Sequence, residues 1–133
     1  ASRLALYGEM VPNLVTARAI LDSVREGRID VGPLDAYWHL LIAKHNPTLT
    51  AGVRVLDSTE VATLPAFVTA ANTPASTINA LRHAFVNACR HPWFREYADT
   101  LLIEGFAAVD TPDYARTLEW DSAAKAAGYA YPA

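Results

Sequence analysis

The sequence TARAILDSVREGRIDVGPLDAY, residues 16–37, decides how this chain folds. Thr16 is a good N-cap, and apolar residues recur after it at helical spacing until Gly27, a residue type that commonly ends helices. Residues 29–32 are short and apolar apart from Asp30, as in a buried parallel strand. The stretch therefore predicts a helix followed by a strand, which is an α/β arrangement.

Asp35 follows this predicted strand at its C-terminal end, the position at which ligands bind in open α/β sheets. Asp35 is also well placed to cap a second helix over residues 36–45, and that role alone would account for a carboxylate there. The two roles are compatible, because a capping side chain at a strand end still presents an oxygen to the crevice. We therefore predict that Asp35 binds ligand and that Tyr37 and Trp38 line the site.

The start of the first predicted helix is a second candidate for ligand binding. Backbone N–H groups in the first turn of a helix are unpaired and can hold an anion, and Arg18 adds a positive charge. An exposed arginine without any role in binding fits the sequence equally well. Thr16 and Arg18 join Asp35, Tyr37 and Trp38 in the predicted ligand-binding set.

The rest of the chain begins as α/β and becomes mainly helical. Strands are predicted at residues 11–15, 53–59 and 64–69, and helices at residues 74–90, 93–103 and 111–127. Thr73 and Thr111 each precede a proline, so both are expected to be N-caps. Gly105 is the expected stop of the middle helix.

Composition excludes several classes of protein. The 133 residues are 52% hydrophobic and 19% charged, which excludes a disordered chain. The net charge is −3 without a basic patch, so nucleic acid is an unexpected partner. No apolar run approaches the roughly 18 residues that a membrane span requires. The chain is long enough to form one ordinary domain.

No catalytic or metal-binding motif stands out. Cys89 is the single cysteine, so an internal disulfide and a cysteine-based metal site are both excluded. It lies on the apolar face of a predicted helix and is expected to be buried. The four histidines do not form an H-x-x-x-H pair, and the nucleophile and phosphate-loop motifs are absent. We expect no catalytic residue, no metal and no cofactor, and hence a protein that is not an enzyme.

Residues 19–37 resemble a region of the phosphate/phosphonate-type substrate-binding proteins of ABC transporters. In that region a helix, a glycine, a short apolar strand and an aspartate follow one another, as they do here with Gly27 and Asp35. Later segments agree with the order of the family: residues 53–56, 64–68, 101–106 and 113–114. The resemblance covers nearly the whole chain, and it is to the C-terminal half of proteins that are normally longer.

The resemblance implies an α/β fold that is part of a two-lobe type II periplasmic-binding fold, in its helix-rich C-terminal half. Residues 1–50 would belong to the second lobe, and residues 51–59 would form a hinge or crossover strand. Residues 60–133 would form the C-terminal, mostly helical part of the first lobe. Because the sheets of the family are built from both halves of the sequence, the isolated chain is expected to self-associate through uncovered strands and apolar faces.

The function implied is that of an ABC transporter's solute-binding component, in the periplasm or another extracytoplasmic location. It would capture a small polar molecule, phosphonate-like or amine-bearing, between two lobes and hand it to a membrane permease. Asp35 matches the aspartate of the family, which suits a cationic or hydroxyl-bearing ligand group. Two alternatives remain open on the same fold: a biosynthetic enzyme of a pyrimidine-precursor or menaquinone pathway, and the effector-binding domain of a transcription regulator.

Overall fold

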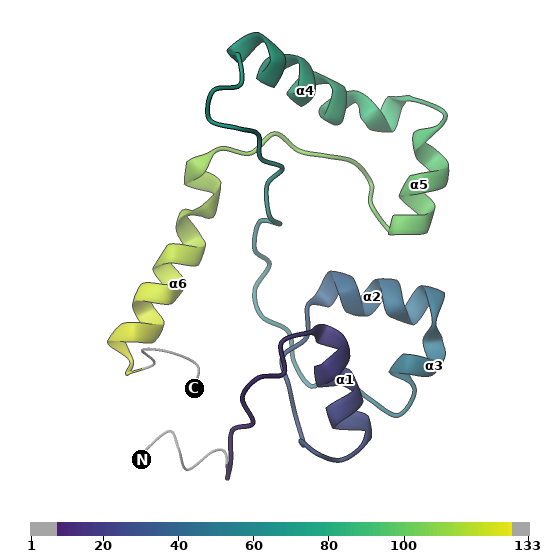
Figure 1. The fold of residues 1–133 in the computed structure, drawn as a ribbon, viewed down its shortest axis with the longest axis vertical. Helices are drawn as coiled ribbons and strands as arrows, with labels where there is room; N and C mark the ends of the chain where they lie inside the picture. The colour runs from purple at the N-terminus through teal and green to yellow at the C-terminus, as the bar shows by residue number, and fades with distance from the viewer. Residues whose placement is uncertain (1–7, 129–133) are drawn as a thin grey trace. The chain divides into compact units, whose positions relative to one another are not determined.

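The computed structural model describes residues 8–128 and contains helices but no β-strand within that range (Figure 1). The chain divides into two compact units, with the boundary between Ser58 and Thr59. The helices of unit 1 are α1 (Ala17–Arg25), α2 (Ala36–His45) and α3 (Pro47–Thr50). Those of unit 2 are α4 (Ala75–Asn87), η2 (Ala88–Arg90), α5 (Phe94–Leu101), η3 (Thr111–Tyr114) and α6 (Ala115–Ala126).

Helix α1 begins and ends where its sequence predicts. The Thr16 side chain caps the first turn, and Gly27 follows the last turn in the left-handed conformation, with φ +69°. The Gly27 N–H donates to the Val24 carbonyl at 3.1 Å, and the Arg28 N–H donates to the Ser23 carbonyl at 2.9 Å. These two bonds form a Schellman motif, in which glycine is favoured because it has no Cβ.

Helix α2 also agrees with its prediction, with Asp35 as N-cap and Asn46 as C-cap. The chain then forms α3, a four-residue helix that the sequence analysis did not predict. Pro47 occupies its first position, where a missing N–H costs nothing. The Thr48 hydroxyl donates to the Asn46 side-chain oxygen at 2.7 Å and supports this turn.

The four segments predicted as strands form no strand, so these strand predictions are wrong and the sheet of the expected α/β fold is not seen in the described residues. Asn13 adopts φ +69°, which interrupts residues 11–15. Among the described residues, no backbone–backbone hydrogen bond involves residues 54–69. A strand is stable only when a neighbouring strand pairs with its backbone, and these segments have no such neighbour. The helical content fits part of a periplasmic-binding fold, and the two-lobe sheet is not seen.

Residues 29–32 pack against α1 and do not pair in a sheet. A Cβ on Gly32 would lie 2.6 Å from Ile20 Cγ2, so the backbone of this segment lies directly against the helix. Ile29 and Gly32 are half-buried, whereas Asp30 and Val31 are exposed. The apolar character of the segment therefore reflects contact with a helix of its own unit.

Two predicted caps in unit 2 are wrong. The N-cap of α4 is Pro74, and the Thr73 side chain makes no capping bond to it. The N-cap of η3 is Asp110, one residue before Thr111. The Asp113 carboxylate accepts the Asp110 N–H at 2.6 Å, which is part of a capping box at the start of η3. A carboxylate is a stronger hydrogen-bond acceptor than the hydroxyl of Thr111.

Helix α5 ends earlier than predicted, and Gly105 does not end it. Leu102 follows the helix in the left-handed conformation, with φ +54°. Gly105 lies against η2, where an added Cβ would meet Cys89 at 3.6 Å. Cys89 itself is exposed, contrary to the prediction that it is buried. The continuous helix predicted over residues 74–90 changes at Ala88 to the tighter η2 turn, which moves Cys89 off the apolar face.

The core of unit 2 is an aromatic cluster around Phe94, which is only 4% exposed. The Phe106 ring lies 5.9 Å from Phe94 and 5.0 Å from Phe85, in edge-to-face arrangements. Phe67 stacks on Phe85 at 4.7 Å, yet it remains 74% exposed. Packing is therefore tight on the Phe94 side of the cluster and open on the Phe67 side.

Three polar contacts join residues 60–64 to the region around η3. The Tyr114 hydroxyl donates to the Leu64 carbonyl at 3.1 Å, and the Thr63 hydroxyl donates to the Asp113 carbonyl at 3.0 Å. Arg116 forms an ion pair with Glu60. These contacts hold the first residues of unit 2 against η3 and the start of α6, although no strand is present there.

Candidate functional site

The N-terminal turn of α1 presents backbone donors without an acidic side chain beside them. The Thr16 Oγ1 accepts the Ala19 N–H at 3.1 Å, and the Thr16 carbonyl accepts the Ile20 N–H at 3.1 Å. Within residues 8–128, no hydrogen bond uses the N–H groups of Ala17 and Arg18. These two donors lie at the positive end of the helix dipole, where they favour an anion.

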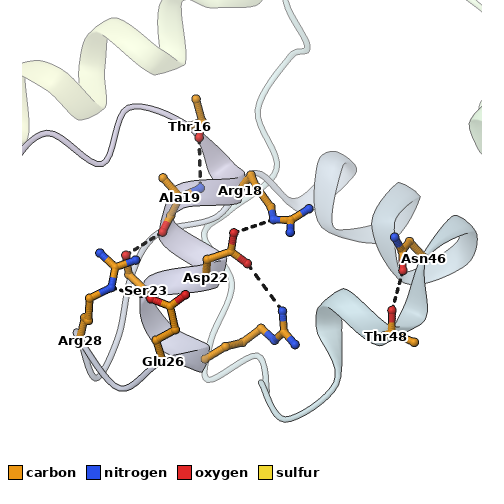
Figure 2. Close-up of polar contacts among 10 residues, drawn as sticks. Thr16, Arg18, Ala19, Asp22, Ser23, Glu26, Arg28, Asn46 and Thr48 are labelled. Atoms are coloured by element: carbon orange, nitrogen blue, oxygen red, sulfur yellow. Dashed lines mark hydrogen bonds and ion pairs between the residues drawn. The ribbon is translucent and has the colours of Figure 1, made fainter.

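Arg18 is exposed, as in the alternative that the sequence left open, and it is also ion-paired. Its Nε lies 2.7 Å from Asp22 Oδ2, one turn further along α1 (Figure 2). The Arg25 guanidinium approaches the other Asp22 oxygen at 3.6 Å. Within the described chain, the terminal nitrogens of Arg18 have no partner, so the guanidinium is oriented by Asp22 and keeps free donors.

Asp35 caps α2 as predicted. Its Oδ1 accepts the Trp38 N–H at 2.6 Å, and the residue is exposed. No described residue bonds to Oδ2, which leaves one carboxylate oxygen for a ligand. Tyr37 and Trp38 are both half-buried, so each contributes to packing and to the surface of α2.

The structure places all five predicted residues in unit 1, at the starts of α1 and α2. The segment leading to Asp35 contacts α1 through Gly32 and Ile20. Among the described residues, no hydrogen bond or ion pair joins Asp35 to Thr16 or Arg18. The two helix starts therefore belong to one unit, and no direct polar contact among the described residues joins them.

A hollow of about 340 Å³ lies at the opposite end of α1 and contains none of the five predicted residues. Its lining consists of Asp22, Arg25, Glu26, Ala51 and Gly52. Charges of both signs line it, and Asp22 is already paired with two arginines. Each of its charged side chains therefore already has a partner, in the hollow or beside it, and the hollow has no strong preference for a cation or an anion.

A second hollow, of about 360 Å³, lies in unit 2 and is lined by Cys89, Arg90, His91, Pro92 and Arg95. The sequence analysis missed it. The signal available was the run RHPWFR, residues 90–95, in which three basic residues surround a helix break. Charge counting over the whole chain hid this run, because the net charge is negative.

Neither a metal-binding cluster nor a membrane-spanning helix occurs among the described residues. Residues 8–128 contain no cluster of three or more His, Cys, Asp or Glu side chains that could hold a metal ion. None of the helices in that range is long and apolar enough to cross a bilayer.

Comparison with known families identifies the family to which this chain is similar. The model of a family described as "ABC transporter, phosphonate, periplasmic substrate-binding protein" matches residues 9–114. The matched range contains both helix starts described above and most of unit 2. Comparison with curated proteins and with solved structures gave no match.

Proposed function

Because the chain belongs to the family of periplasmic substrate-binding proteins of phosphonate ABC transporters, we propose that it captures a small phosphonate-bearing solute for such a transporter. The family implies a small-molecule ligand, a permease as partner and an extracytoplasmic location, and its members are generally not enzymes. The family match over residues 9–114 carries the proposal. The lobe assignments of residues 1–50, 51–59 and 60–133 belong to this proposal as predictions.

The N-terminal turn of α1 binds the phosphonate group in this proposal. The unpaired N–H groups of Ala17 and Arg18 supply backbone donors, and the Arg18 terminal nitrogens supply charged donors. Asp22 restricts the Arg18 guanidinium, so less side-chain freedom is lost when the anion binds. Guanidinium and phosphonate match each other in geometry as well as in charge.

Asp35 binds an amine or hydroxyl of the same ligand through its second carboxylate oxygen. The aromatic faces of Tyr37 and Trp38 then cover the apolar part of the solute, which is how small-molecule sites combine apolar walls with a few polar groups. In the whole protein, closure of the two lobes would bury the ligand before transfer to the permease.

The test is calorimetric titration of the wild-type protein with an aminoalkylphosphonate, an alkylphosphonate and an alkylamine. We expect the strongest binding for the aminoalkylphosphonate. Arg18→Gln should weaken the binding of the alkylphosphonate and of the aminoalkylphosphonate to a similar extent. Arg28→Gln is the matched control, because Arg28 also pairs with a carboxylate, Glu26 at 2.8 Å, but lies at the other end of α1.

Two results would contradict the proposal. Equal loss of affinity in Arg18→Gln and Arg28→Gln would show that the effect is one of general charge and not of a site. If circular dichroism shows that the wild-type protein is folded and it binds neither phosphonate, a phosphonate ligand is excluded.

A further inference from the structure

The hollow in unit 2 is lined by cationic groups and by no carboxylate. The lining residues are Arg90, His91 and Arg95, together with Cys89 and Pro92. The acidic residues of the adjacent helix α5, Glu96 and Asp99, do not line it. These residues are distant in the sequence from the ligand-binding set of unit 1.

The arginines of this hollow differ from the other basic side chains of unit 2 in their lack of a counter-ion. Within the described part of unit 2, each of the other arginine and lysine side chains forms an ion pair with a carboxylate: Arg82 with Asp110, Arg116 with Glu60, and Lys125 with Asp121. No ion pair there involves Arg90 or Arg95. Two unpaired guanidinium groups around one hollow repel each other, and an anion between them would remove that repulsion.

The backbone that carries these groups is held at both ends. Ala88 precedes the lining residues in the sequence and is 5% exposed. Phe94 lies between the lining residues Pro92 and Arg95 in the sequence and is 4% exposed. The His91 N–H donates to the Ala88 carbonyl at 3.0 Å, and the Phe94 N–H donates to the His91 carbonyl at 3.0 Å. The His91 ring also stacks on Trp93 at 6.1 Å. The backbone on both sides of the hollow and the His91 ring are thus positioned before any ligand arrives, which lowers the entropic cost of ordering this part of the site.

We infer that this hollow binds a small tetrahedral oxyanion of the phosphate class, at a site separate from the solute site proposed in unit 1. Guanidinium groups present donors in a planar fork that suits phosphate oxygens. Arg90 and Arg95 are exposed to solvent, so binding is weak and decreases with ionic strength. The inference does not depend on the transport function, because it uses only residues of unit 2.

Cys89 provides a local reporter, because it is exposed, lines the hollow and is the single cysteine of the chain. The experiment measures its reaction rate with dithiobis(nitrobenzoate), a dianion, and with iodoacetamide, which is neutral. The rate with dithiobis(nitrobenzoate) divided by the rate with iodoacetamide reports the local positive potential, because the thiolate fraction is common to both reactions. Inorganic phosphate should lower this ratio more than sodium chloride does at the same ionic strength.

The variant Arg90→Gln/Arg95→Gln should lower the ratio by roughly threefold or more and abolish the phosphate effect, since the local potential comes from these two charges. Arg82→Gln/Lys125→Gln is the matched control, because it removes the same charge from unit 2 outside the hollow. The control should retain both the ratio and the phosphate effect.

The inference is overturned if phosphate and sodium chloride act equally on the wild-type protein, a comparison that needs no variant. It is also overturned if the two double variants lower the ratio equally. Phosphonate titration at the unit 1 site is independent of these measurements, so each proposal can fail without the other.

Discussion

At the scale of single residues, one carboxylate illustrates how folding and binding share a side chain. Asp35 caps α2 through Oδ1 and retains Oδ2 without a partner among the described residues. A cap is a geometric requirement that asparagine also meets, whereas a salt bridge to an amine requires the negative charge. Substitution can therefore separate the two roles.

We expect Asp35→Asn to change the free energy of unfolding little and Asp35→Ala to lower it by about 1 kcal/mol, because only alanine removes the cap. Thermal or urea unfolding measures both. Affinity for an aminoalkylphosphonate should fall in both variants, since both lose the charge. Asp30→Asn is the control, as Asp30 is exposed and lies outside α2. Unchanged affinity in Asp35→Asn would remove Asp35 from the proposed site.

Gly32 is a second residue with a specific steric role. An alanine Cβ there would lie 2.6 Å from Ile20 Cγ2, so Gly32→Ala should destabilise unit 1 by about 1–3 kcal/mol through overpacking. Gly105→Ala should be tolerated, because its Cβ would meet Cys89 at an ordinary 3.6 Å. The double variant Gly32→Ala/Ile20→Ala should be less destabilised than the two single effects predict, because it removes the clashing methyl. Simple additivity of the two effects would show that the contact is not formed.

At the scale of elements, helix ends decide where the chain turns. Glycine ends α1 at Gly27, whereas α5 ends on Leu102 in the same left-handed region, at φ +54°. A side chain with a Cβ is strained there, and Leu102 is also 43% exposed, so it buries little apolar surface in compensation.

We expect Leu102→Gly to raise the free energy of unfolding of unit 2 by up to about 1 kcal/mol, because glycine adopts this conformation without strain. Gly27→Ala should lower the free energy of unfolding of unit 1, because alanine is strained at the φ of +69° that Gly27 adopts. Differential scanning calorimetry of both variants provides the measurement. A decrease in stability for Leu102→Gly would mean that the lost apolar contacts outweigh the strain.

At the scale of the whole molecule, the chain leaves much apolar surface exposed relative to its buried core. Buried apolar residues in the described range are Leu21, Ala88 and Phe94, whereas Phe67 and Val68 are 74% and 88% exposed. Contiguous apolar surface favours association, and an unpaired extended segment offers its backbone to another chain.

We predict that this 133-residue chain self-associates at micromolar concentrations, as measured by light scattering. Phe67→Ser/Val68→Ser should reduce the apparent mass, because it removes apolar surface from the unpaired segment. Val15→Ser is the control, since Val15 is 89% exposed but lies in unit 1. A monomer at all concentrations would show that the exposed residues are not associating surfaces.

Local chemistry was sufficient to predict much of this chain. The helix limits Thr16–Gly27 and 36–45, the cap at Asp35 and the family of the protein follow from residue types and spacing. Caps and helical periods act over a few residues, so the sequence displays them directly. The ligand-binding set of Thr16, Arg18, Asp35, Tyr37 and Trp38 remains a prediction from the same local signals.

Only the tertiary structure decided the state of residues 29–32, 53–59 and 64–69, which the sequence predicts as strands but which pair with none in the described range. Strand formation depends on a partner strand that is often distant in the sequence, so apolar character alone cannot predict it. Tertiary structure also decided the exposure of Cys89 and the hollow between Arg90 and Arg95. The exposure of Cys89 follows from the change to η2 at Ala88, which the sequence did not predict. The sequence does predict the break after residue 90, but the hollow there also depends on the packing of Ala88 and Phe94, which are 5% and 4% exposed.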